Sequence, residues 1–197
     1  MSQHWREIAF TPAVADEQER QGSRDRYAGR TSPEPDRLGA AERAFLAERD
    51  GFSLASVGET GWPYVQHRGG PPGFLRVLDD ATLGWADFRG NLQHVTTGNL
   101  TGDDRVALLV VDHARRRRLK VFGRARVTTA PAVLARLTDP AYDAVVQRAV
   151  LVAVEGLDWN CPQHIVPRYS AAELAPLHAR LRALEEENAA LRAAARA

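Results

Sequence analysis

The sequence predicts a mainly β fold with flanking helices, in which antiparallel strands form a closed or nearly closed barrel. Apolar residues begin to alternate at Phe52, which is the period of a half-buried strand, and Gly58–Gly61 then has the composition of a tight turn. A further observation concerns the C-terminus, where leucines recur at alternating three- and four-residue steps from Leu174. That spacing is typical of a coiled-coil helix.

The composition is that of an ordinary globular protein. The chain has 197 residues, of which 44% are hydrophobic and 26% are charged, so it is long enough for one domain with appendages. The longest apolar runs, Val106–Val111 and Ala149–Val154, are far shorter than the roughly 18–20 residues of a membrane span. Residues 1–10 mix His, Arg and Glu where a signal peptide would be apolar. We therefore expect a cytoplasmic protein with no membrane partner.

The cysteine content and the net charge exclude further classes of protein. Cys161 is the only cysteine, which excludes an intramolecular disulfide framework and a CxxC motif. The net charge of +1 argues against a nucleic-acid partner. Lys120 is the only lysine, so we expect any anion held by a basic side chain to be held by arginine, whose planar fork matches phosphate.

Residues 1–50 are predicted to form a helical N-terminal extension. Ser32–Pro35 has the composition of a loop, and Asp36 is a suitable N-cap for a helix that ends at about Glu48. Phe45 belongs to the apolar face of that helix.

Residues 51–168 are predicted to form the barrel. After the strand that begins at Phe52, six more segments read as short strands: Tyr64–Arg68, Phe74–Leu78, Thr82–Ala86, Arg105–Asp112, Leu119–Val127 and Val150–Gly156. Two helices are expected among them, near Asn91–Leu100 and from Pro131 to about Gln147.

Residues 169–197 are predicted to form an amphipathic heptad helix. The heptad a and d positions are Leu174, Leu177, Leu181, Leu184, Asn188 and Leu191. In a parallel pair, the flanking residues bring Arg180 to Glu185 and Glu187 to Arg192 of the other helix, and both pairs attract. The alternative is that the leucines pack on the chain's own barrel, since three heptads are few for a coiled coil.

Four segments carry residues suited to binding. Gln66–Arg68 places donors at a strand end before the Gly- and Pro-rich Gly69–Gly73, which would admit a phosphate or a heterocycle, or would simply connect two strands. Trp85–Asn91 runs from a strand into a helix start with Asn91 as a possible cap, which is an arrangement that binds anions. Arg115–Lys120 is a basic run, and such a run usually lies at a solvated hairpin tip.

The fourth segment, Asp158–Ile165, follows the last predicted strand. An aromatic residue among amides favours a surface on which a flat ring stacks. A nucleophilic Cys161 with His164 as its base is an alternative, whereas a zinc site would need more ligands than these two, so no metal is expected.

These segments, in order, resemble the flavin mononucleotide (FMN)-binding split-barrel family around pyridoxamine 5'-phosphate oxidase. The resemblance runs from about Phe52 to Arg168. Its most specific segments are Trp85–Asn91, Gly98–Leu100, Arg118–Ala125 and Asp158–Ile165, and the N-terminal Phe10–Pro12 with Gln18–Tyr27 is similar to the leader of a bacterial subgroup. The resemblance implies a six-stranded antiparallel split barrel that forms a homodimer, with FMN in clefts at the subunit interface.

The resemblance also implies cofactor-binding residues. On the strand that contacts phosphate and on the next contacting strand, the matching positions are Gln66, His67, Arg68, Trp85, Ala86, Asp87 and Asn91. The hairpin strand contributes Arg118, with Arg116 beside it. The partner-subunit tryptophan matches Trp159, and the arginine that follows matches Arg168 with the spacing short by one residue.

The chain departs from the family at the phosphate clamp. The oxidase has adjacent Arg and Lys where this chain has Asn91 and Leu92, so the phosphate needs another cation, either Arg68 or one of the arginines of 115–118. The resemblance implies an FMN-dependent oxidoreductase that acts on a small-molecule substrate. A flavin carrier or sensor without turnover is an alternative, as is a split barrel that binds haem or a deazaflavin. No catalytic residue is predicted, because flavin redox chemistry often needs no protein nucleophile.

Overall fold

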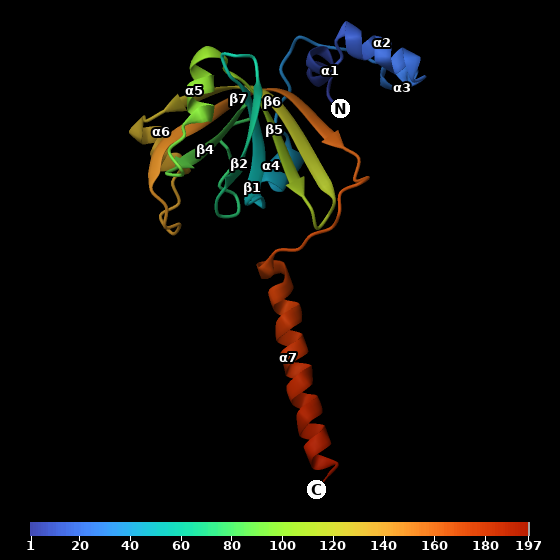
Figure 1. Ribbon diagram of the computed structural model, residues 1–197, viewed down its shortest axis with the longest axis vertical. Coiled ribbons are helices and arrows are strands. Elements are labelled where there is room, and N and C mark those ends of the chain that lie inside the picture. The colour runs from blue at the N-terminus through green and yellow to red at the C-terminus, as the bar shows by residue number, and fades with distance from the viewer. Residues whose placement is uncertain (197) are drawn as a thin grey trace. The chain divides into compact units, whose positions relative to one another are not determined.

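The computed structural model describes residues 1–196, which divide into two compact units. The first unit comprises residues 1–112 and 117–162, and the second comprises residues 113–116 and the chain from 163 onward. The first unit contains the sheet and six of the helices in the described residues, and the second contains a single long helix (Figure 1). No helix in residues 1–196 combines the length and the apolar character that crossing a membrane requires.

The first unit is built on one antiparallel sheet of seven strands (Figure 1). Its strand order is β2-β1-β5-β6-β7-β4-β3. The strands are β1 (Gly51–Val57), β2 (Pro63–Gly69), β3 (Arg76–Val77), β4 (Thr82–Phe88), β5 (Arg105–Asp112), β6 (Arg117–Thr128) and β7 (Val146–Asn160).

The sheet curls so that strands far apart in its order face each other. The rings of Phe52 in β1 and Trp85 in β4 meet edge to face with centroids 5.1 Å apart, and Phe74 stacks on Phe52 at 5.7 Å. These rings belong to one buried core that also holds Leu108 of β5 and Val121 of β6. The mainly β architecture with flanking helices is therefore confirmed.

The expected six-stranded, closed or nearly closed barrel is wrong in two respects. The sheet has seven strands, and among the described residues its edge strands β2 and β3 share no backbone ladder. Strand β3 has only two residues, so it is too short to complete a barrel, and Phe74, which was expected to begin a strand, is instead a buried residue ahead of it. Strand β2 meets β4 through the ion pair between Arg68 and Asp87.

The N-terminal residues form three helices, α1 (Gln3–Ala9), α2 (Pro12–Arg20) and α3 (Arg24–Tyr27). Trp5 of α1 is buried, and its ring stacks on Phe122 of β6 at 4.1 Å. This contact attaches the first helix to the outer side of the sheet.

Helix α4 (Ala40–Ala47) begins later than the sequence predicted. Its N-cap is Gly39, whose N–H donates to Glu42 Oε2 at 2.9 Å. Asp36, the predicted cap, instead accepts hydrogen bonds from the Leu157 N–H at 2.7 Å and from the Ser2 hydroxyl. The carboxylate thus ties the N-terminus to β7 rather than starting a helix.

The two other predicted helices of the first unit also differ in extent. Helix α5 is Val95–Gly102, and helix α6 is Pro131–Leu137. The helix expected to reach Gln147 ends ten residues earlier, at Leu137. Pro140 lies just beyond that end and disfavours a helical backbone at Asp139, and Val146 and Gln147 belong to β7.

The second unit contains helix α7 (Ala171–Ala194). Ser170 caps it: its hydroxyl accepts from the Glu173 N–H at 3.2 Å, while Glu173 Oε2 accepts from the Ser170 N–H at 2.8 Å. This reciprocal capping box fixes where the helix begins.

Candidate functional site

Strand β2 brings two predicted site residues to the inner side of the sheet. Gln66 lies opposite Leu54, and Arg68 lies opposite Phe52, in the β1–β2 ladder. Leu54 and Phe52 are buried core residues, so Gln66 and Arg68 share the core-facing side of this edge strand. His67 between them belongs to the opposite face, where its ring lies against Gly51 and Gly69.

Asp87 of β4 lies between two arginines. Arg68 Nη1 donates to Asp87 Oδ1 at 3.1 Å, and Arg148 Nε of β7 approaches Asp87 Oδ2 to 3.4 Å. The Asp87 side chain is 10% exposed and each arginine is 19% exposed. We call these three residues the Arg68–Asp87–Arg148 cluster.

This cluster has more positive than negative charge. Two guanidinium groups share a single carboxylate, which leaves a net charge of +1 in a largely buried place. The Nε atoms of Arg68 and Arg148 are both buried and make no hydrogen bond among the described residues, but Arg148 Nε lies 3.4 Å from Asp87 Oδ2 in the ion pair. Buried donors are usually satisfied, so the Arg68 Nε–H group is available to an anionic acceptor.

The start of α5 lies against the same cluster. Thr96, which is buried in the first turn of α5, donates its hydroxyl to Gln66 Oε1 at 3.3 Å. His94, the N-cap residue, has Nδ1 3.4 Å from Arg148 Nη2. The backbone N–H groups of a first helical turn have no partner within their helix. A helix start beside cations is an arrangement that favours phosphate binding.

The other predicted positions of the segment Trp85–Asn91 do not belong to this cluster. Trp85 is a core residue that is 1% exposed, and Ala86 is buried in a separate apolar cluster with Leu137 of α6. Asn91 does not cap α5: its Oδ1 accepts from the Gln93 N–H at 3.2 Å in the preceding turn, and the helix begins at Val95.

Trp159 lies within β7 rather than on a loop after the last strand. Its Nε1 donates to Glu42 Oε1 of α4 at 2.6 Å, and its ring meets Phe45 edge to face at 4.8 Å. The Arg117 guanidinium lies over the same ring at 4.6 Å. In this structure, Trp159 therefore holds α4 against the sheet of its own chain.

The predicted arginines outside β2 lie in different places. Arg118 is in β6, paired with Val111 of β5, and its Nε is buried without a hydrogen-bond partner in residues 1–196. Arg116 is in the turn before β6 with a φ of 52°, so it does not belong to the strand that carries Arg118. Arg168 is an exposed residue of the second unit.

Sequence reasoning missed Arg148, His94 and Thr96. Arg148 falls immediately after the range expected to be helical, and its role depends on the pairing of β7 with β4, where it lies opposite Asp87. The available signal was the strand predicted from Val150, which the structure extends back to Val146. His94 and Thr96 carry no signal by themselves, because only the fold brings α5 to β2.

The fold and the cluster together define a class of protein. It is an antiparallel β protein with a curled sheet, and it has a largely buried cluster of two arginines where β2, β4 and β7 meet. The family model for pyridoxamine 5'-phosphate oxidase matches residues 38–182. The chain belongs to this family. No curated protein matches the chain significantly.

Two solved structures of one streptococcal protein show the same fold. HupZ of Group A Streptococcus aligns with a TM-score of 0.52 at 17% identity, over 67% of this chain and all 100% of HupZ. A variant of HupZ in which one histidine is replaced by alanine gives 0.51 at 18% identity, over 62% and 99%. A Clostridium acetobutylicum protein of the pyridoxinephosphate oxidase family, related to general stress protein 26, gives 0.46 at 12% identity, over 61% and 85%.

Proposed function

We propose that this protein binds FMN and acts as an oxidoreductase on a small-molecule substrate. The observation that carries the proposal is the Arg68–Asp87–Arg148 cluster, where the buried Arg68 Nε donor and a surplus positive charge suit a phosphate. Membership of the pyridoxamine 5'-phosphate oxidase family supports a flavin as the group that carries this phosphate.

The residues present fit the phosphate of FMN. The family's Arg-Lys clamp is replaced by Asn91 and Leu92, and Arg148, brought in by β7, supplies a second cation beside Arg68. Gln66 adds a neutral donor to the same place through its amide N–H groups, and Thr96 holds that side chain by donating its hydroxyl to Gln66 Oε1. The clamp is thus rebuilt from different strands.

A bound flavin would supply the electron or hydride transfer through its isoalloxazine ring. The protein's own part is to bind and orient the cofactor. Arg68 and Arg148 hold the phosphate, and Asp87 holds both guanidinium groups in place. An enzyme of this kind needs no protein nucleophile, so the proposal assigns no catalytic residue.

The proposal includes a homodimer, as the family resemblance implies. Both faces of β5 are apolar: Leu108 faces the core, whereas Ala107 and Leu109 face outward, and Leu109 is 39% exposed. An antiparallel strand with one solvated face normally alternates apolar and polar residues. A hollow of about 340 Å³ on this outer side is lined in part by Ala55, Ala107 and Phe122. A second copy of the chain is the partner we assign to this face.

The test compares FMN with riboflavin, which lacks the phosphate. A charge-assisted contact contributes on the order of 1.5–3 kcal/mol, so Arg68→Ala should weaken FMN binding by about ten- to a hundredfold and leave riboflavin affinity nearly unchanged. Fluorescence titration of both ligands measures this. Arg126→Ala, which removes an exposed arginine on β6, is the matched control.

Two other results would contradict parts of the proposal. Equal weakening of both ligands would place Arg68 at the ring or in the scaffold, and no weakening would remove β2 from the site. The absorption spectrum of the purified protein distinguishes flavin from haem or a deazaflavin. Multiple turnovers with a reductant and an acceptor distinguish an enzyme from a carrier or sensor.

A further inference from the structure

Helix α7 carries a row of leucines that its own unit leaves in solvent. Leu177, Leu181, Leu184 and Leu191 are 63%, 52%, 42% and 64% exposed, and no described residue of the helix is buried. They lie at heptad d, a, d and d positions, so they share one side of the helix. A continuous apolar stripe of this kind normally packs against another surface.

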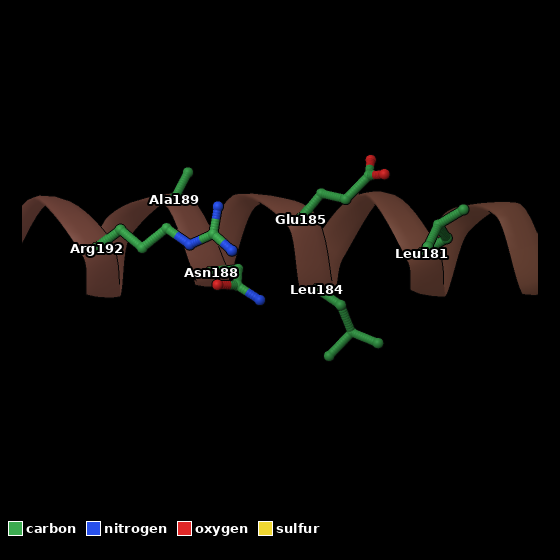
Figure 2. Close-up of a pocket in the computed structure, with 6 residues that line it drawn as sticks. All are labelled: Leu181, Leu184, Glu185, Asn188, Ala189 and Arg192. Carbon is green, nitrogen blue, oxygen red and sulfur yellow. The ribbon is translucent and has the colours of Figure 1, made fainter.

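The stripe is shaped like the contact face of a coiled coil. A shallow hollow of about 340 Å³ lies along it between Leu181, Leu184, Asn188 and Arg192. Figure 2 shows Leu184 and Asn188 on one side of the helix, and Glu185 and Ala189 on the other. Knobs from a facing helix fill holes formed by four such residues.

The charges that flank the stripe are complementary to those of a second copy. In a parallel pair, each g position faces the e position five residues later on the other helix. The three g residues, Glu173, Arg180 and Glu187, would then face His178, Glu185 and Arg192. The last two are oppositely charged pairs.

Asn188 favours the parallel arrangement over the antiparallel one. In a parallel pair, a positions face each other, so the two Asn188 amides meet and hydrogen-bond. In an antiparallel pair, a faces d, and all three d positions of α7 are leucine, so each buried amide would lose its partner. An unpaired buried polar group costs about 1–3 kcal/mol.

We infer that α7 pairs in parallel with α7 of a second copy of this chain, as a short coiled coil in which the two Asn188 side chains hydrogen-bond at the interface. The capping box at Ser170 and the many Ala, Leu, Glu and Arg residues favour the helix itself. Pro176 lies inside the helix and weakens its first turns, so the leucines from Leu177 onward form the contact.

Three heptads are few for a stable isolated coiled coil. If the sheets also pair, as proposed above, the two copies of α7 are held at an effective concentration in the millimolar range, which favours their association. The pairing of α7 does not otherwise depend on flavin binding, and the experiment below uses no flavin.

Cysteine crosslinking of the full chain tests the inference. In a Cys161→Ser background, Ala195→Cys places a thiol at an a position, and Ala193→Cys places one at the outward f position. Under mild oxidation, the Ala195→Cys protein should form a disulfide-linked dimer about tenfold faster than the Ala193→Cys protein. An antiparallel pair would hold the two residues 195 about 36 Å apart, because a helix rises 1.5 Å per residue.

A second pair of variants checks that the leucine stripe causes the faster crosslinking at position 195. Adding Leu181→Glu and Leu184→Glu to the Ala195→Cys protein should reduce its rate to that of the Ala193→Cys protein. The matched control, Ala179→Glu with Ala183→Glu, adds the same charge at f and c positions and should leave the rate unchanged. Equal rates at 193 and 195, or no crosslink at either, would overturn the inference, whatever the flavin titration shows.

Discussion

Asp87 sets the charge of the candidate site, because it is the one carboxylate that contacts both Arg68 and Arg148 in the described part of the chain. Its side chain is nearly buried, so its two ion pairs are less screened than pairs on the surface. Asp87 therefore has two separate roles. It holds the guanidinium groups in place, and it limits the net charge of the cluster.

Asp87→Asn should separate those two roles. Loss of the carboxylate leaves two arginines near each other, so we expect the free energy of unfolding to fall by about 2–3 kcal/mol, less than for a fully buried pair because the arginines are one-fifth exposed. The charge of the cluster rises from +1 to +2, so the ratio of FMN affinity to riboflavin affinity should rise. Urea unfolding and ligand titration measure the two effects. With Asp16→Asn, on the exposed face of α2, as the control, an unchanged stability would show that Asp87 does not hold the arginines.

Single residues were predicted best where local chemistry determines them. Arg68 was identified from its position at a strand end before a glycine-rich segment, and the structure places it in the cluster. Trp159 was expected on a loop, because an aromatic residue among amides says nothing about where a strand ends. Arg148 was missed because its partner Asp87 is 61 positions earlier in the chain, and only the pairing of β4 with β7 brings the two together.

Helix α5 positions Thr96 and His94 because other contacts fix the helix. Asn99 Nδ2 donates to the Ser56 hydroxyl of β1 at 3.0 Å. At the C-terminal end, Asp103 Oδ1 accepts from the Arg105 N–H at 3.0 Å and from Arg105 Nε at 2.9 Å. The Asp103 contact forms the corner between α5 and β5.

The Asp103 corner predicts a pH dependence of stability. Hydrogen bonds from Arg105 lower the pKa of the Asp103 carboxyl from 3.8 to about 2. A lowered pKa in the folded state stabilises the protein at pH values above 3.8, and that contribution is lost as the pH falls from 3.8 towards 2. Asp103→Asn should therefore lower the Tm above about pH 4 and have a much smaller effect near pH 2. Thermal melts of both proteins from neutral pH down to about pH 2 measure the difference. A difference in Tm that stays constant across this range would assign the loss to something other than the ionised carboxyl.

Elements were predicted well where an apolar run is unbroken and poorly where the end of a helix had to be placed. Strand β5 has the predicted bounds, Arg105–Asp112, because an unbroken apolar run lies between these two charged residues. The segment from Pro131 was expected to be helical as far as Gln147, but α6 ends at Leu137 and β7 begins at Val146. Pro140 was the local signal for that earlier end, because proline disfavours a helical backbone in the residue before it.

At the scale of the whole molecule, the sheet curls because the residues on its inner face pack into one core. It stays open because its edge strands β2 and β3 do not pair. Phe52 and Trp85 meet because large aromatic residues lie on the inner face of β1 and β4. Such residues indicate a core, which is why a curled β protein could be predicted. The seven strands agree with the seven strand segments that the sequence pattern indicated. The failure of β2 and β3 to pair depends on the two-residue length of β3, where the sequence pattern of Phe74–Leu78 suggested a longer strand.

The proposed dimer predicts that flavin occupancy follows dimer content. The outer face of the sheet carries Val65, which is 63% exposed, and Leu109, so Val65→Glu with Leu109→Glu would place charges in an apolar interface. We expect this double variant to be monomeric and to lose most of its flavin, because the family resemblance implies a cofactor cleft that both chains complete. Sedimentation velocity, followed by protein absorbance and at the flavin absorption band, measures both quantities in one run. Val14→Glu, at an exposed position of α2, controls for added charge. A monomer that keeps its full flavin would show that each chain binds the cofactor alone, and would leave the apolar face of β5 without a role in the site.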